Sequence, residues 1–174
     1  ENNKKYAQSS DNEDRVVFMG NSITEGWSTI LPEFFKGKSY INRGISGQTT
    51  PQMLIRFRPD VIDLNPKVVI ILAGINDIAE NTGPSTVKMI SDNIISMADL
   101  AKINGINVII SSILPAKGFP WNPGINPPPK ISAVNKIIEQ YAKENGMIYL
   151  DYYSSMVDKN NALIESYGSD SVHP

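Results

Sequence analysis

Short apolar runs rich in β-branched residues alternate with amphipathic stretches along almost the whole of this chain. The runs occupy residues 15–20, 39–42, 67–73, 107–112 and 147–151. Each run has the length of a strand, and residues 67–73 are apolar on both faces, as in the centre of a parallel sheet. Strands that alternate with helices form βαβ units, so the pattern predicts an α/β fold with a parallel sheet between helices.

Helical periodicity fills the intervals between these runs. Apolar residues recur at spacings of three and four over residues 87–101, which predicts one face of a helix there. A second helix is predicted from about Pro129 to residue 146, and a shorter one from residue 50 to a point before Pro59.

The length of 174 residues is typical of one domain. We place that domain at residues 15–174, behind an exposed polar lead-in of residues 1–14. The absence of cysteine from the sequence excludes disulfides, thiolate metal sites and a cysteine nucleophile. The sequence has 16 Lys and Arg residues and 18 Asp and Glu residues, and its basic residues do not gather in a stripe. We therefore expect no nucleic-acid partner. The apolar runs are too short to span a membrane.

The first residue is Glu1 rather than a methionine. We therefore expect a processed protein whose signal peptide has been removed, exported to the periplasm or the medium. A cytoplasmic location stays open as the alternative.

Polar residues follow the first three runs, at the point where each predicted strand ends. These segments are Gly20-Asn21-Ser22, Gly44-Ile45-Ser46-Gly47 and Gly74-Ile75-Asn76-Asp77. Ligands bind beyond the carboxyl ends of strands in open α/β sheets, and a strand order of 2-1-3 would bring the segments together. Each segment also has a structural explanation: Ser22 and Glu25 as a capping box, the glycines as turn residues, and Asn76-Asp77 as a turn or cap.

Together with the C-terminal tail, these segments contain the groups that ester hydrolysis needs. Such a reaction uses an exposed serine, an imidazole base oriented by a carboxylate, and donors for the developing oxyanion. Ser22 is the candidate nucleophile. His173, the single histidine of the sequence, is the candidate base, and Asp170 is its orienting acid. The N–H groups of Ser22 and Gly47 and the side-chain amide of Asn76 are the candidate oxyanion donors.

Four segments of the chain resemble, in order, the four motif blocks of the SGNH (GDSL-like) hydrolase superfamily. They are Gly20-Asn21-Ser22-Ile23-Thr24, Gly44-x-x-Gly47, Gly74-Ile75-Asn76-Asp77 and Asp170-x-x-His173-Pro174. The resemblance implies a three-layer α/β/α sandwich of flavodoxin-like topology, with a five-stranded parallel sheet in the order 2-1-3-4-5. It also implies the roles given above for the five site residues, and neither a metal nor an organic cofactor.

Two features depart from the superfamily pattern. Asn21 stands where aspartate is common, but that aspartate is not the acid of the superfamily's triad. Relatives usually continue past His-Pro into a final helix that packs on the sheet. Because the sequence ends at Pro174, we expect this domain to lack that helix.

The substrate hypothesis comes from the same resemblance. Residues 18–24 and 42–50 are similar to bacterial carbohydrate O-acetylesterases and to platelet-activating-factor acetylhydrolase-like enzymes. This implies a small-molecule or oligosaccharide ester as substrate, with O-acetyl groups on a carbohydrate as our first hypothesis. Six of the twelve prolines lie between residues 114 and 130, around Phe119 and Trp121. Those two rings could line a sugar-binding wall or only pack within the loop. Asn21 is a further candidate substrate contact.

Other functions stay open. One is a lipid esterase or thioesterase of the same superfamily, and another is a glycan-binding module that turns nothing over. The sequence favours an enzyme over a binding module, because a binding module has no need of all four of the candidate catalytic residues Ser22, Asn76, Asp170 and His173. A nucleotide-binding function is weaker, because neither Gly-x-Gly-x-x-Gly nor a Walker-type loop follows the first strand.

Overall fold

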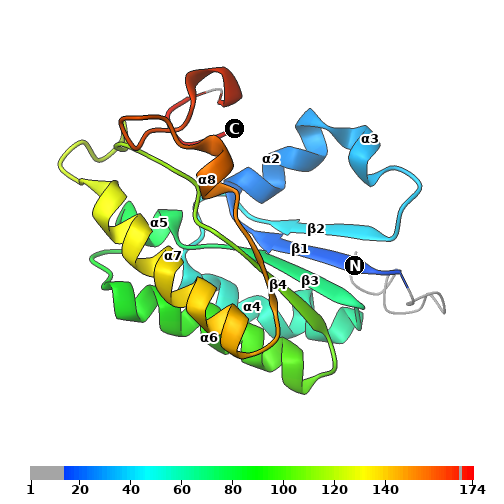
Figure 1. The fold of residues 1–174 in the computed structure, drawn as a ribbon. Coiled ribbons are helices and arrows are strands. Elements are labelled where there is room, and N and C mark those ends of the chain that lie inside the picture. The colour runs from blue at the N-terminus through cyan, green and yellow to red at the C-terminus, as the bar shows by residue number, and fades with distance from the viewer. Residues whose placement is uncertain (1–13, 169) are drawn as a thin grey trace.

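A five-stranded parallel sheet forms the centre of the computed structural model, which describes residues 14–168 and 170–174 (Figure 1). The strand order is β2-β1-β3-β4-β5, so the predicted α/β fold and the predicted order are confirmed. The strands are β1 (Val16–Gly20), β2 (Tyr40–Gly44), β3 (Val68–Leu72), β4 (Asn107–Ser111) and β5 (Ile148–Leu150). Of the expected lead-in, residues 1–13 lie outside the described residues, and Asp14 is exposed.

Helices lie on both faces of the sheet (Figure 1). One face is covered by α4 (Thr50–Asp60), α6 (Val87–Ile103) and α7 (Pro127–Glu144), and the other by α2 (Ser22–Ile30) and α3 (Pro32–Phe35). Four short elements complete the fold: η1 (Ile62–Leu64), α5 (Ile75–Ile78), α8 (Tyr153–Met156) and η2 (Glu165–Tyr167). Among the described residues, no helix combines the length and the apolar character that crossing a membrane requires.

Two helix boundaries that involve proline differ from the predictions. The helix α4 continues through Pro59 to Asp60 rather than ending before the proline. A proline in the last turn removes one helical hydrogen bond, and the fully buried side chain of Phe57 fixes that turn against the core. The helix α7 begins at Pro127, two residues earlier than predicted, because prolines in a first turn lack only N–H groups that have no helical partner.

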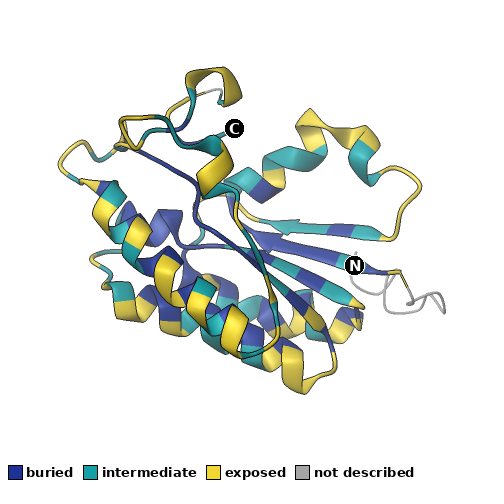
Figure 2. Ribbon diagram, in the orientation of Figure 1, coloured by how far each residue is buried: buried dark blue, intermediate teal, exposed yellow. Residues whose placement is uncertain are grey.

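The main hydrophobic core lies between the sheet and the layer of α4, α6 and α7. Alternate strand side chains point into it and are almost fully buried: Val17, Met19, Val69, Ile71 and Ile110. Figure 2 shows this burial along the sheet and the inner sides of the three helices. On β3, the neighbouring side chains of Ile70 and Leu72 point to the opposite face and are only half-buried. The predicted burial of this strand on both faces is therefore complete on one face only.

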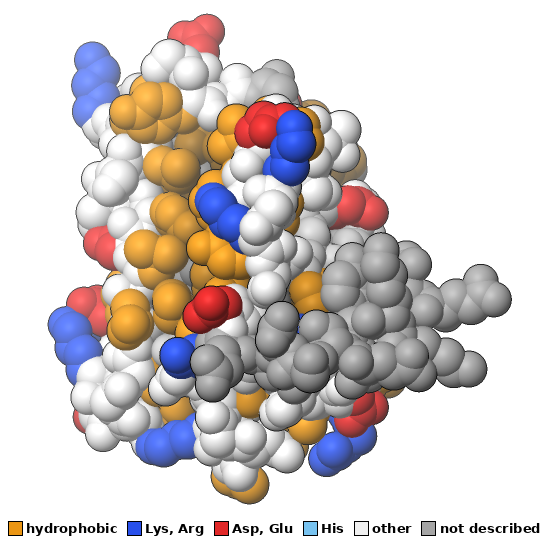
Figure 3. Space-filling view, turned by 90° about the vertical axis from the view of Figure 1, so that its right-hand side faces the viewer, with side chains coloured by type: hydrophobic (Ala, Val, Ile, Leu, Met, Phe, Trp, Pro, Cys, Tyr) orange, Lys and Arg blue, Asp and Glu red, His pale blue; other side chains and the backbone are white. Residues whose placement is uncertain are grey.

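The opposite face of the sheet is covered by a cluster of aromatic rings near β1 and β2. Farther from these two strands, that face is open. Trp27 stacks on Phe34 at 4.8 Å between ring centroids, and Phe18 meets Trp27 edge-on at 5.5 Å. Beside this cluster lies a groove of about 340 Å³, whose lining is almost wholly apolar. Figure 3 shows hydrophobic side chains gathered in a band on one side of the molecule.

Candidate active site

Ser22 lies on the turn between β1 and α2, at the carboxyl end of the sheet. It is the first residue of α2, and the side chain of Asn21 caps the helix by accepting from the N–H of Ile23 at 3.0 Å. A residue in the first turn has no helical partner for its N–H, so the Ser22 amide is available to an incoming oxygen. Asn21 is only 1% exposed, and its Nδ2 has no hydrogen-bond partner among the described residues. Asn21 is therefore a buried helix cap in this structure, and its contact with substrate stays a prediction.

Gly44 lets the end of β2 pack directly against the first turn of α2. A Cβ atom at Gly44 would lie 2.1 Å from the backbone nitrogen of Glu25, which no side chain tolerates. This close approach brings residues 45–49, here called the Gly47 loop, beside the turn that carries Ser22. Gly47 itself has a φ of +75°, which favours glycine.

Glu25 ties α2 to the Gly47 loop. Its Oε2 accepts hydrogen bonds from the backbone N–H of Ser46, at 3.0 Å, and from the Ser46 hydroxyl. A capping box between Ser22 and Glu25, the structural alternative raised by the sequence, is therefore not what Glu25 forms. Ser46 directly precedes Gly47, so this contact holds the residue next to the one that carries the candidate oxyanion donor.

Asn76 meets the same loop from the end of β3. It lies in α5 behind Gly74, is 5% exposed, and donates from Nδ2 to the carbonyl of Gln48 at 3.0 Å. A side-chain amide has two N–H donors, so this bond sets the orientation of the amide and leaves the second donor free to bind a ligand oxygen.

Asp77 anchors the far end of the loop. Its carboxylate accepts from the backbone N–H of Thr50 at 2.9 Å and from the Thr50 hydroxyl at 2.6 Å. Burial raises the pKa of Asp77, and the hydrogen bonds from Thr50 act in the opposite direction. Asn76 therefore joins the end of β3 to the Gly47 loop, and Asp77 joins it to the first residue of α4. The sequence indicated Asn76 as a candidate site residue and Asp77 only as part of a turn or cap.

The C-terminal tail brings His173 to Ser22. The Ser22 Oγ lies 2.9 Å from His173 Nε2, and His173 Nδ1 lies 2.9 Å from Asp170 Oδ2. The other carboxylate oxygen of Asp170 accepts from the backbone N–H groups of Val172, at 2.7 Å, and His173, at 2.8 Å. Val172 is 2% exposed and anchors the tail in the core.

The electrostatics of the tail favour an ionised Asp170. Partial burial of Asp170 disfavours its charge. The hydrogen bonds from the backbone and the ring of His173 and from Val172 outweigh that penalty and hold the pKa of Asp170 below its ordinary value. An ionised carboxylate at Nδ1 keeps the proton of a neutral imidazole on that nitrogen, which leaves Nε2 free to accept from Ser22.

The two aromatic residues of the proline-rich loop occupy different environments. Phe119 is 2% exposed and packs in the core, which favours the packing alternative; a contact of its ring with a ligand stays a prediction. Trp121 is 49% exposed and lies on Phe119, with 5.3 Å between ring centroids. The Trp121 indole donates to Asn81 Oδ1 at 3.2 Å, and Asn81 donates to the Gly47 carbonyl at 3.4 Å. Trp121 therefore lies one residue away from the Gly47 loop.

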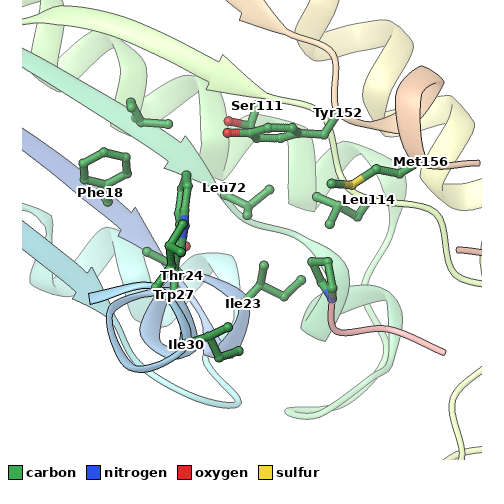
Figure 4. Close-up of a pocket in the computed structure, with 13 residues that line it drawn as sticks. Phe18, Ile23, Thr24, Trp27, Ile30, Leu72, Ser111, Leu114, Tyr152 and Met156 are labelled. Atoms are coloured by element: carbon green, nitrogen blue, oxygen red, sulfur yellow. The ribbon is translucent and has the colours of Figure 1, made fainter. Parts of the chain in front are cut away.

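The apolar groove includes chain neighbours of Ser22 and His173 in its lining. These neighbours are Ile23 and Pro174. Figure 4 shows how the side chains of Ile23, Leu72 and Leu114 point into the space between α2, β3 and the segment after β4. The remaining lining residues are Phe18, Thr24, Trp27, Ile30, Leu31, Ile70, Ser111, Tyr152 and Met156. Within residues 14–168 and 170–174, no three His, Asp or Glu side chains converge as a metal site would require.

A serine, an imidazole and a carboxylate in hydrogen-bond contact at the carboxyl edge of a parallel α/β sheet are typical of serine hydrolases. The sequence comparison gives the family. Residues 18–174 match the GDSL-like lipase/acylhydrolase family, and the chain belongs to it.

Three proteins illustrate the similarity. A Bacteroides fragilis structure described as an acylhydrolase is 51% identical, with a TM-score of 0.96 over 99% of this chain and 84% of that one. The Bacillus subtilis lipoprotein YqeF is 31% identical over 58% of this chain and 48% of its own length. The Vibrio mimicus arylesterase is 31% identical over 58% of this chain and 54% of its own. The matched region thus spans about half the length of each of the last two.

Proposed function

We propose that this chain is a serine esterase that hydrolyses O-acetyl esters, with carbohydrate acetates as its substrates. Ser22 is the nucleophile, His173 the general base and acid, and Asp170 the residue that orients the imidazole. The observation that carries the proposal is the continuous pair of contacts, 2.9 Å from Ser22 Oγ to His173 Nε2 and 2.9 Å from His173 Nδ1 to Asp170. Membership of a family of acylhydrolases supports the same chemistry.

The reaction proceeds in two acyl transfers. His173 Nε2 takes the Ser22 proton as Oγ bonds to the ester carbonyl carbon, and the carbonyl π electrons move to the oxygen. The tetrahedral intermediate collapses, the bond to the alcohol oxygen breaks, and His173 gives its proton to the departing alcohol. Water then attacks the acetyl-enzyme by the same route, releasing acetate and returning the proton to Ser22.

The developing oxyanion is stabilised by donors that are fixed before the reaction. These are the N–H groups of Ser22 and Gly47 and the second N–H of the Asn76 amide. Donors that are already oriented need no reorganisation at the transition state, which is why each contributes strongly to the rate. Contacts from Glu25 to Ser46 and from Asn76 to Gln48 support this role, because they fix the loop on both sides of Gly47.

Replacing Asn76 by alanine removes one of these donors. We expect Asn76→Ala to lower kcat for an acetyl ester by about 10²–10³-fold, with little change in KM. The matched control is Asn107→Ala, which also removes an amide bonded to a backbone carbonyl, that of Lys67, but at the start of β4. The prediction is tested by measuring steady-state kinetics of both variants. An Asn76→Ala enzyme as active as the wild type would exclude Asn76 from the oxyanion hole.

Trp121 supports a carbohydrate as the alcohol part of the ester. Its half-exposed ring is backed by Phe119 and linked through Asn81 to the Gly47 loop, so a flat apolar surface lies close to the candidate oxyanion donors. The C–H face of a pyranose ring packs well on such a surface.

The role of Trp121 is tested with two acetyl donors. We expect Trp121→Ala to raise KM for an acetylated oligosaccharide by roughly fivefold to tenfold and to leave glycerol triacetate unaffected, because only the sugar extends onto the ring. Trp121→Phe keeps a ring and should retain most of the affinity. Equal effects of Trp121→Ala on both esters would contradict a sugar-binding role.

The apolar groove favours a second candidate, an esterase for longer acyl chains, because Ile23 and Pro174, the chain neighbours of Ser22 and His173, both line it. Ile70 and Leu72, on the central strand β3, both line this groove. Rates on acetyl, butyryl and octanoyl esters of one alcohol separate the two candidates. A rise with acyl length would favour the lipid esterase.

We also propose that the protein is exported. The support is the name of the Bacillus subtilis relative, a lipoprotein. Fractionation of the source cells should find the protein outside the cytoplasm.

A further inference from the structure

Arg56 is a partly buried guanidinium that the proposed mechanism does not use. It lies on α4, behind the loop that carries Gly47, and its side chain is 13% exposed. Its Nη1 donates to Asp60 Oδ2 at 2.7 Å on the next turn of the helix. An ion pair between two side chains on one helix does not need the remaining donors, so their partners indicate what else the residue does.

The remaining donors of Arg56 reach the two segments that flank the candidate site. Nη2 donates to the carbonyl of Gly20 at 3.0 Å, two residues before Ser22, and Nε donates to the side chain of Gln48. Gly20 is the last residue of β1, and its carbonyl also accepts from the N–H of Ile45, at the start of the Gly47 loop. One planar guanidinium therefore contacts both the strand that leads to the nucleophile and the loop that carries an oxyanion donor.

Gln48 extends this connection to the third donor. Its side chain accepts from Arg56, while its backbone carbonyl accepts from Asn76 Nδ2 at 3.0 Å. Arg56, Gln48 and Asn76 thus form a chain of hydrogen bonds that runs behind the site. The geometry points to Arg56 as a positioning residue. We infer that it fixes the spacing between the Ser22 turn, the Gly47 amide and the Asn76 amide, and so sets the oxyanion hole.

This inference rests on the proposed function, because it matters only if an oxyanion forms. Arginine suits the role better than lysine, since its planar fork can satisfy three acceptors at fixed angles. A displacement of about 1 Å at a catalytic group can cost about 10²-fold in rate. We therefore expect Arg56→Gln to lower kcat by about tenfold to a hundredfold, with KM within about twofold of the wild type. Arg56→Lys should be intermediate.

The matched control is Arg58→Gln, which makes the same change two residues along α4 at an exposed position. Gln48→Leu is the second variant. It removes the side-chain acceptor, keeps the backbone carbonyl that Asn76 uses, and tests the inference should Arg56→Gln fail to fold. We expect Gln48→Leu to lower kcat by about tenfold and Arg58→Gln to leave it unchanged.

The deciding readout is inhibition by a trifluoromethyl ketone, which binds the nucleophile as an oxyanion. Its Ki should rise in proportion to the fall in kcat/KM across the Arg56 and Gln48 variants. Variants that fold and keep wild-type kcat, or that lose activity with an unchanged Ki, would overturn the positioning role. A wild-type protein that hydrolyses no ester and is not labelled at Ser22 would instead overturn the proposed function itself.

Discussion

We expect His173→Ala to lower kcat for hydrolysis of an acetyl ester by about 10⁴-fold or more. His173 is the single histidine of the sequence, so no other imidazole can take the proton from Ser22. Ser22→Ala should cost a similar factor, and the double variant should be little worse than either single one. Groups that act as one unit lose most of their effect when any member is removed.

Kinetics and folding must be measured together for this prediction. His173 is partly exposed, so replacing it should change the thermal unfolding temperature little. A folded His173→Ala enzyme that keeps a tenth or more of the wild-type kcat would rule out His173 as the base. A double variant with the product of the two single losses would show that Ser22 and His173 act independently.

The second large effect is expected from Asp170→Asn, with a loss of about 10³–10⁴-fold in kcat. The asparagine oxygen can still accept from the N–H groups of Val172 and His173, so the tail keeps its backbone contacts. Its NH₂ group then faces Nδ1 and favours the tautomer with the proton on Nε2, which cannot accept from Ser22. KM should change little. A kcat near the wild-type value would exclude Asp170 as the orienting acid.

The same variant has a predicted pH signature in stability. Hydrogen bonds lower the pKa of Asp170 in the folded state, so its contribution is present above the unfolded value of about 3.9. That contribution is lost as pH falls through the lower folded value. The gap in thermal unfolding temperature between wild type and Asp170→Asn should therefore be constant near neutral pH and close below about pH 4. A gap that stays constant into strong acid would contradict the ionised carboxylate.

The α/β architecture could be predicted because the local sequence patterns of strands and helices are consistent with the topology of a parallel sheet. Each strand is a short β-branched run, and the residues of interest follow strand ends, which meet at one edge of a parallel sheet. Ser22 and Asn76 could therefore be named as candidate site residues from the sequence. His173 was a candidate because it is the single histidine, and Asp170 because it lies three residues before His173. Their catalytic roles stay predictions.

Contacts between distant elements could not be predicted in the same way. The spacing of Glu25 from Ser22 indicates a capping residue, but the Glu25 side chain accepts from Ser46 instead. The two residues meet only because β2 and α2 pack closely at Gly44, and the local sequence pattern does not show that packing. Arg56 on α4 gave no signal, since its acceptor at Gly20 lies 36 residues away in sequence. Both side chains contact the site through tertiary packing rather than local pattern.

The sequence also did not allow us to predict which individual side chains are buried and which are exposed. Phe119 and Trp121 share the proline-rich loop and look equivalent, but the fold buries the first and exposes the second. Asn21 stands beside the nucleophile in sequence, and the helix start turns its side chain inward as a cap. The run of residues 67–73 is apolar on both faces, and nothing in it indicates that one face borders a groove.

The most direct test of a Ser22–His173–Asp170 esterase is covalent labelling with a fluorophosphonate, read by peptide mass spectrometry. The probe forms a phosphonyl ester only with a serine whose hydroxyl is activated by a base. We predict one equivalent of label on the wild-type protein, located on Ser22, and almost none on Ser22→Ala or His173→Ala. Label on another serine, or label that persists in Ser22→Ala, would contradict the assignment.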